Sequence, residues 1–132
     1  MYMMEFTPDA IHNLKTDEVI VFSTNLEGKH CRGLAKYCFQ KFGAIYGQAT
    51  GFQGQCYAFA TRTIDKKISI SYIKEQIESF IEFVKKEKDL TFFVTKIGSD
   101  EFEIGDIAVL FMSYEYPDNV IFPKEFYEWS KL

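Results

Sequence analysis

Val19-Ile20-Val21-Phe22 is the stretch that decides the fold. Its residues are all β-branched or aromatic and lack polar alternation, which is typical of a strand buried on both faces of a sheet. Two similar runs follow, Cys56-Tyr57-Ala58-Phe59-Ala60-Thr61 and Leu90-Thr91-Phe92-Phe93-Val94-Thr95. Three such runs in one chain predict a mostly parallel sheet flanked by helices.

Helical patterns lie between these strands. The clearest follows Ser69, a good N-cap, and has the spacing of one buried helix face at Ile70, Ile73, Ile77, Phe80, Ile81 and Val84. Thr7 and Pro8 suggest the start of another helix. The remaining predicted elements are helices over Pro8–Leu14, Leu34–Phe42, Ile104–Met112 and Phe126–Trp129, and short strands at Ala44–Tyr46 and Asn119–Phe122. Together they predict one three-layer α/β domain over residues 1–132.

Composition excludes several classes of protein. The 132 residues are 47% hydrophobic, which argues against disorder, and the net charge of -4 argues against a nucleic-acid binder. No apolar run approaches the roughly 18 residues that cross a bilayer, and the first residues do not resemble a signal peptide, so we expect a cytoplasmic protein without membrane contact. The 14 Phe and 8 Tyr leave open a surface for a protein partner or a second copy of the chain.

Parallel strands place their following loops at one edge of the sheet, where ligands of open α/β sheets bind. The candidate segments there are Thr24–Gly33, Arg62–Lys67 and Lys96–Glu101. The glycine-rich loop Gly47–Gln55 joins them if it folds over the same edge.

The loop after the first strand is rich in glycine and positive charge. It runs Asn25-Leu26-Glu27-Gly28-Lys29-His30-Cys31-Arg32-Gly33 and opens a helix. Backbone amides at a helix N-terminus bind phosphate oxygens, and Lys29, His30 and Arg32 add positive charge. We expect amide hydrogens beside Gly28 and at the start of the Leu34 helix to converge on a hollow for negative oxygens. The alternative is a strand-to-helix turn that needs φ > 0 at Gly28 and Gly33.

The second glycine-rich loop has the same two interpretations. Gly47, Gly51 and Gly54 allow a close approach of the backbone to a ligand, and the interleaved glutamines can orient polar groups. The alternative is a surface loop packed by Phe52.

Catalytic and metal-binding patterns are weak. His30 and Cys31 are adjacent, so they cannot face each other as base and nucleophile, and no acid is placed to orient His30. Asp100, Glu101, Glu103 and Asp106 form either an acid–base group or a solvated helix start. The three cysteines contain no CxxC pair, and no metal-ligand spacing is present, so we expect reduced thiols, no metal and no cofactor.

The ordered segments resemble a family of small phage-associated and bacterial non-structural proteins with a Ser-Asn-Leu-x-Gly-x-His-Gly-type loop. The resemblance covers roughly Val19 to Phe126. It is carried by segments Val21–His30, Lys41–Gln48, Gly51–Ala58, Phe93–Gly98, Asp106–Phe111 and Asn119–Pro123.

That family is similar to macro domains, which bind ADP-ribose on an α/β scaffold. The resemblance implies a nucleotide-type pocket lined by Asn25, Gly28, His30, Gly54 and the Ile97–Gly98 loop. The chain departs from the family pattern at Cys31-Arg32 and in the acidic segment Ser99–Phe102. Carboxylates at Asp100 and Glu101 repel a pyrophosphate at close range.

Three functions follow from these observations. The first is binding of a phosphate-bearing, ADP-ribose-like nucleotide derivative at the carboxyl ends of the strands, with ligand residues Asn25, Gly28, His30, Arg32, Gly33, Gly51, Gly54 and Gly98. The second is a protein-interaction module of phage or mobile-element origin whose pocket is eroded. The third is a hydrolase of ADP-ribose-type esters, in which Asn25 orients the substrate and His30, Asp100 or Glu101 handles the proton.

Overall fold

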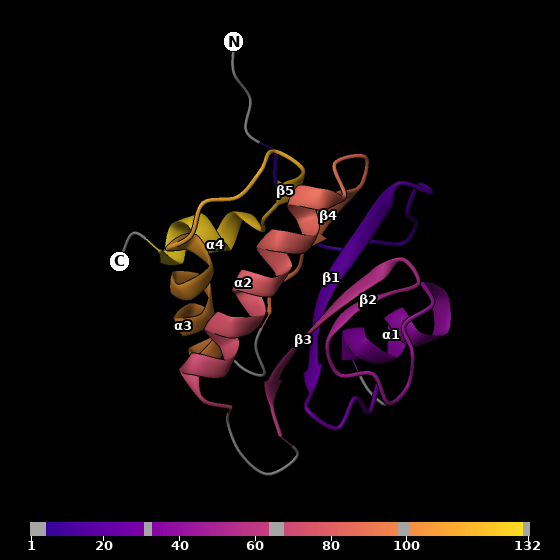
Figure 1. Ribbon diagram of the computed structural model, residues 1–132, viewed down its shortest axis with the longest axis horizontal. Coiled ribbons are helices and arrows are strands. Elements are labelled where there is room, and N and C mark those ends of the chain that lie inside the picture. Colours follow the sequence, from indigo (N-terminus) through magenta and orange to yellow (C-terminus); the bar gives the residue numbers. More distant parts are fainter. Residues whose placement is uncertain (1–4, 31–32, 64–67, 98–100, 131–132) are drawn as a thin grey trace.

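A mostly parallel five-stranded sheet forms the centre of the protein. The computed structural model describes residues 5–30, 33–63, 68–97 and 101–130. The strands lie in the order β2-β3-β1-β4-β5, and only β2 is antiparallel to its neighbour (Figure 1). They span β1 (Glu18–Asn25), β2 (Gly51–Gln53), β3 (Cys56–Arg62), β4 (Thr91–Val94) and β5 (Val120–Ile121). The helices are α1 (Gly33–Lys41), α2 (Ile70–Lys86), α3 (Glu101–Met112) and α4 (Lys124–Trp129).

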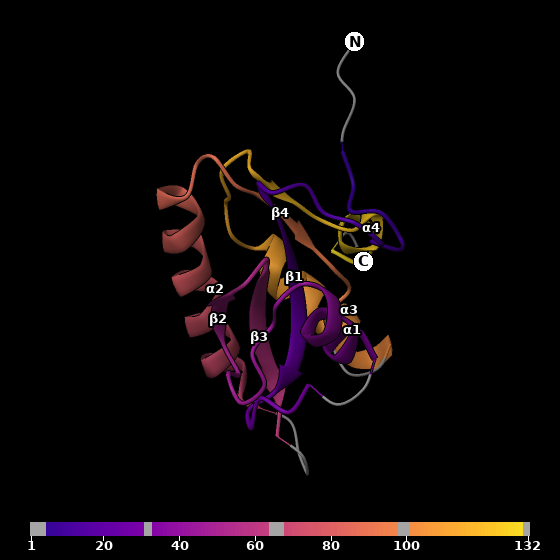
Figure 2. The same cartoon turned by 90° about the vertical axis from the view of Figure 1, so that its right-hand side faces the viewer.

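Helices cover both faces of the sheet, as the apolar strands predict. Figure 2 shows α2 on one side of the strands and α1 on the other. Because side chains alternate along a strand, Val19 and Val21 join the core under α2, whereas Ile20 and Phe22 join a smaller core under α1. The prediction of an α/β fold with a mostly parallel, helix-covered sheet is therefore confirmed.

The larger core is built mainly from aromatic rings. Phe80 of α2 lies with its ring centroid 4.9 Å from that of Tyr57, 5.3 Å from that of Phe59 and 5.7 Å from that of Phe92. Phe111 of α3 and Phe126 of α4 extend the same core. Many of the aromatic side chains therefore pack inside the protein. No helix among the described residues is both long and apolar enough to cross a bilayer.

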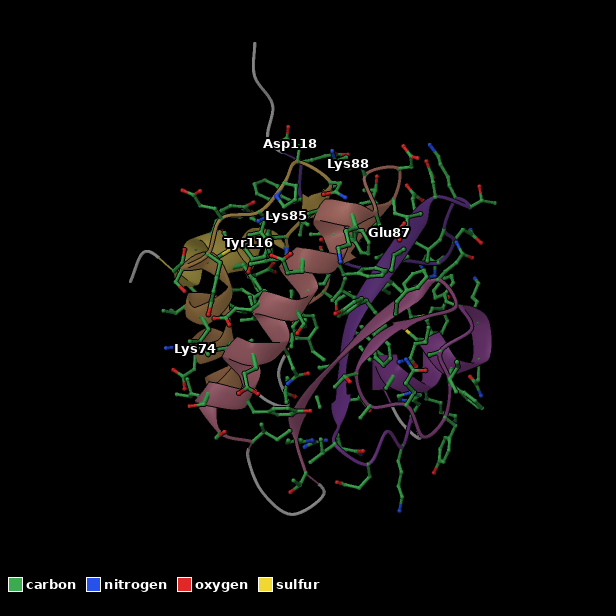
Figure 3. The ribbon with its side chains drawn as sticks, in the orientation of Figure 1. Lys74, Lys85, Glu87, Lys88, Tyr116 and Asp118 are labelled. Atoms are coloured by element: carbon green, nitrogen blue, oxygen red, sulfur yellow. The ribbon has the colours of Figure 1, made fainter. Side chains whose placement is uncertain are left out.

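Helix α2 forms as its sequence predicts. The Ser69 side chain accepts a hydrogen bond from the Tyr72 amide, and the apolar stripe faces the sheet. At the other end the Asn119 side-chain nitrogen lies 3.1 Å from three carbonyl oxygens, those of Val84, Glu87 and Leu90. Figure 3 shows Lys85, Glu87 and Lys88 around this helix end, close to Asp118. The turn before β5 is thus tied to the carboxyl end of α2 and to the loop that leads into β4.

Two predicted elements are wrong. Residues 8–14 are not helical, because Thr7 is used elsewhere: its amide donates to Phe122 O and its hydroxyl to Ile121 O, which ties the chain start to β5. Residues 44–46 are not a strand, and the edge strand β2 lies later, at Gly51–Gln53. The other predicted elements are present, with ends shifted by at most three residues.

The chain connections define a switch point between β1 and β4. The connection that leaves β1 passes through α1 on one face, and the connection that leaves β4 passes through α3 on the opposite face. In open α/β sheets a crevice forms where neighbouring strands send their connections to opposite faces. In this fold the rule points to the carboxyl ends of β1 and β4.

Candidate functional site

A cleft of about 470 Å³ lies beside the carboxyl end of β4, on the face of the sheet that α1 covers, with Ile20 from the first half of β1 on its wall. We call it the switch-point cleft, because it lies between α1 and the residues that follow β4. Its walls come from the first turn of α1, the residues that follow β4, and residues 7–12, which we call the N-terminal segment. Gly33 and Leu34 begin α1 beside it, and Thr95 and Lys96 follow β4. The volume falls within the roughly 300–1,000 Å³ typical of small-molecule sites.

The cleft combines apolar walls with a few polar groups. Ile11, Leu34, Tyr37 and Pro123 supply the apolar surface, and the polar side chains include those of Asp9, His12, Thr95 and Lys96. The first turn of α1 adds backbone amides, since the first N–H groups of a helix have no partner within it. Apolar walls with few polar groups are the usual composition of a ligand site.

Among the described residues, Lys96 is the lysine that lines this cleft, and it is already paired. Its Nζ lies 2.8 Å from Glu125 Oε2, on the first turn of α4. The hydrogen bond to Glu125, together with the charges of Glu125 and Asp9, raises the pKa of Lys96. The same hydrogen bond lowers the pKa of Glu125. Both side chains are partly solvent-exposed, so the pair is open to competition from another charged group.

The loop after β1 differs from the expected anion hollow. The Gly28 amide donates to Asn25 O, and the Lys29 amide donates to Asn25 Oδ1. Gly28 has a φ of +70°, and a Cβ there would lie 2.6 Å from the carbonyl carbon of Gly47. The space beside Gly28 is therefore filled by the backbone of the second glycine-rich loop, and these two amides are engaged within the chain.

His30 is buried in the same unit, with 1% of its surface exposed. The Ile45 amide donates to Gln53 Oε1, which fixes that oxygen as an acceptor. His30 Nε2, 3.3 Å from the same oxygen, must then be the donor, and Nδ1 accepts from the Thr24 hydroxyl at 3.2 Å. Both ring nitrogens of His30 are thus satisfied by protein groups.

The other predicted ligand residues lie apart from one another. Gly33 is on the wall of the cleft, and Gly51 begins β2 beside a separate hollow next to Tyr57. Gly54 packs against Gly43 beyond the amino end of β3, at the opposite end of that strand from Asn25. Arg32, Gly98 and Asp100 lie outside the described residues. The structure brings together Asn25, Gly28 and His30, and Gln53 links His30 to Gly51, whereas Gly54 lies against Gly43 at the other end of β3.

Two buried glutamines hold backbone segments together through hydrogen bonds, a role that the sequence did not indicate. Gln53, besides accepting from Ile45 and His30, donates to Gln48 O and Gly51 O. Gln76 lies on the apolar face of α2, and its amide group exchanges two hydrogen bonds of 2.7 Å with the backbone of Ala60. The sequence does carry a signal for Gln76, because it is a polar residue within the apolar stripe of Ile73, Ile77 and Phe80.

Three further features concern metal binding, the cysteines and a second groove. No three His, Cys, Asp or Glu side chains among the described residues are grouped to hold a metal ion. Cys38 and Cys56 are free and buried, and their mutual hydrogen bond, together with burial, raises the pKa of the Cys38 thiol. A second apolar groove lies between α2 and α3, where Ile70 and Val109 are half-exposed or more.

Comparison of this chain with protein-family models, with curated proteins and with solved structures finds no match. The resemblance to the phage-associated family stays a prediction.

Proposed function

We propose that this protein binds a small phosphate-bearing ligand of the nucleotide class, ADP-ribose-like in its chemistry, in the switch-point cleft. The single observation that supports this most is the coincidence of three features: a cleft of suitable volume, the first turn of α1 on its wall, and a lysine that lines the same cleft. A helix N-terminus and a lysine are both favourable partners of phosphate oxygens. A macro-domain-like arrangement of the fold is part of the same proposal.

Each wall of the cleft has a role in this proposal. Lys96 and the amides at Gly33 and Leu34 face the phosphate, because they supply positive charge and hydrogen-bond donors. Tyr37 and Leu34 contact the base, since an aromatic ring offers a stacking surface. The Asp9 carboxylate accepts hydrogen bonds from ribose hydroxyl groups, as acidic residues do in dinucleotide sites.

A catalytic role for Asn25 and His30 has no support in this arrangement. Asn25 Oδ1 caps the turn at Lys29, and His30 is enclosed by Thr24 and Gln53. Neither side chain lines the cleft. Binding without catalysis by these two residues is therefore the function that the geometry supports best.

Substitution of Lys96 by glutamine tests the proposal. We expect Lys96→Gln to weaken binding of ADP-ribose or AMP roughly tenfold, because it removes one charge-assisted contact to phosphate. Isothermal titration calorimetry measures the change directly.

Lys29→Gln is the matched control. Lys29 is an exposed lysine of the loop after β1, where the sequence alone places the ligand. We expect Lys29→Gln to leave the affinity for ADP-ribose or AMP unchanged. Strong weakening by Lys29→Gln together with normal binding by Lys96→Gln would place the ligand on the loop and contradict the cleft.

A further inference from the structure

The cation of the proposed site is held by an acid from a different element. Lys96 follows β4 and lines the cleft, whereas its partner Glu125 belongs to α4 and is not part of the cleft wall. The 2.8 Å contact between Lys96 Nζ and Glu125 Oε2 places a carboxylate oxygen on the ammonium group. A phosphate oxygen bound to Lys96 would also have to lie within hydrogen-bond distance of Nζ, as the Glu125 oxygen does.

The backbone that carries Glu125 is fixed, while its side chain is not. The next residue, Phe126, is fully buried against Phe111 and Phe122. The side chains of Lys96 and Glu125 are 45% and 27% exposed, so either can turn towards solvent. The carboxylate is therefore held near the cleft by the fold but is free to release the lysine.

We propose that Glu125 competes with the ligand: its carboxylate occupies Lys96 in the free protein and must give way, or share the lysine, when a phosphate binds. This inference rests on the proposed function. In the free protein Glu125 of α4 thus weakens anion binding, because its negative charge lowers the electrostatic potential that Lys96 presents to the cleft. Ligand binding and the contact between Lys96 and Glu125 then oppose each other.

The competition has a signature that depends on ligand charge. The energy of a ligand in the field of Glu125 is proportional to the charge of that ligand. Removal of the Glu125 charge should therefore improve the binding of AMP, which carries close to two charges at about pH 8, and should leave neutral adenosine unaffected. A purely structural effect of the substitution on the cleft would change both ligands.

The test compares Glu125→Gln with Glu128→Gln. Glu128 lies on the same helix and pairs with Lys124 at 3.9 Å, so its substitution removes the same charge without touching Lys96. At low ionic strength we expect Glu125→Gln to tighten AMP binding about two- to fivefold, the range expected from the loss of a partly exposed ion pair. Adenosine affinity and the Glu128→Gln variant should match the unmodified protein.

The outcomes separate this inference from the proposed function. If the unmodified protein binds AMP and Glu125→Gln binds it equally well, the competition is refuted while the ligand site stands. An equal gain for adenosine, or for Glu128→Gln, also refutes it. If neither the unmodified protein nor Glu125→Gln binds AMP or ADP-ribose at millimolar concentration, the proposed function itself is refuted.

Discussion

Tyr57 is a buried phenol at the centre of the aromatic core. Its ring lies 4.9 Å from that of Phe80 and 5.4 Å from that of Phe83, measured between centroids. Burial raises the pKa of Tyr57 to about 12, because the phenolate is poorly solvated in this position. The folded state therefore favours the neutral form of this residue.

The raised pKa makes stability depend on alkaline pH. A phenol in the unfolded chain titrates near pH 10, so the contribution of Tyr57 is complete below about pH 10 and is lost between about pH 10 and 12. Tyr57→Phe keeps the ring packing but has no phenol to ionise. Between about pH 10 and 12 we therefore expect the unfolding free energy of the unmodified protein to fall by about 2–3 kcal/mol more than that of Tyr57→Phe. Urea denaturation at several pH values measures the difference, and identical pH slopes for the two proteins would contradict the assignment.

The conformation of individual glycines is predictable from sequence, but the contacts that they permit are not. Gly28 and Gly33 have φ values of +70° and +62°, as the strand-to-helix turn requires. The partners that close the loop, Gly47 and Gln53, come from segments about 20 residues later. Nothing in the local pattern indicates that they fill the space expected for a phosphate.

At the level of elements, one side chain of α2 completes the sheet edge. β2 begins at Gly51, opposite Ala58, so Ala60 of β3 lies beyond β2 and has no strand neighbour on that side. The Gln76 amide accepts from Ala60 N and donates to Ala60 O, as a neighbouring strand would. Helix and sheet are thereby joined by hydrogen bonds as well as by the apolar core.

Replacement of this glutamine should be costly. We expect Gln76→Leu to lower the unfolding free energy by about 2–4 kcal/mol, because two backbone groups of Ala60 lose their partners in a buried place. Gln40→Leu, on the exposed face of α1, serves as the control and should change stability by less than about 0.5 kcal/mol. Equal denaturation midpoints for the two variants would show that the Gln76 hydrogen bonds contribute little.

Elements with a strong local pattern were predictable, and those set by distant contacts were not. The stripe after Ser69 defines α2, and apolar runs define β1, β3 and β4. Thr7 and Pro8 give a helix-start signal, yet Thr7 bonds Ile121, 114 residues away. β2 has only three residues and begins with a glycine, so its short sequence carries no strand pattern.

At the scale of the whole molecule, the cleft exists only because segments far apart in sequence meet at the switch point. The rule that ligands bind at strand carboxyl ends leads from the sequence to segments that contain Gly33 and Lys96, both of which line the cleft. It does not predict that the N-terminal segment forms part of the cleft wall or that α4 supplies Glu125. Those contacts depend on tertiary packing at β5, where Thr7 and Phe126 are held.

The position of the ligand is the central claim, and amide NMR of the ¹⁵N-labelled protein titrated with ADP-ribose or AMP tests it most directly. We predict progressive, saturable shifts of the amide signals of Gly33, Leu34, Thr95 and Lys96, which line the cleft. Shifts confined to Asn25–His30, or to the groove near Ile70 and Val109, would contradict the proposed site.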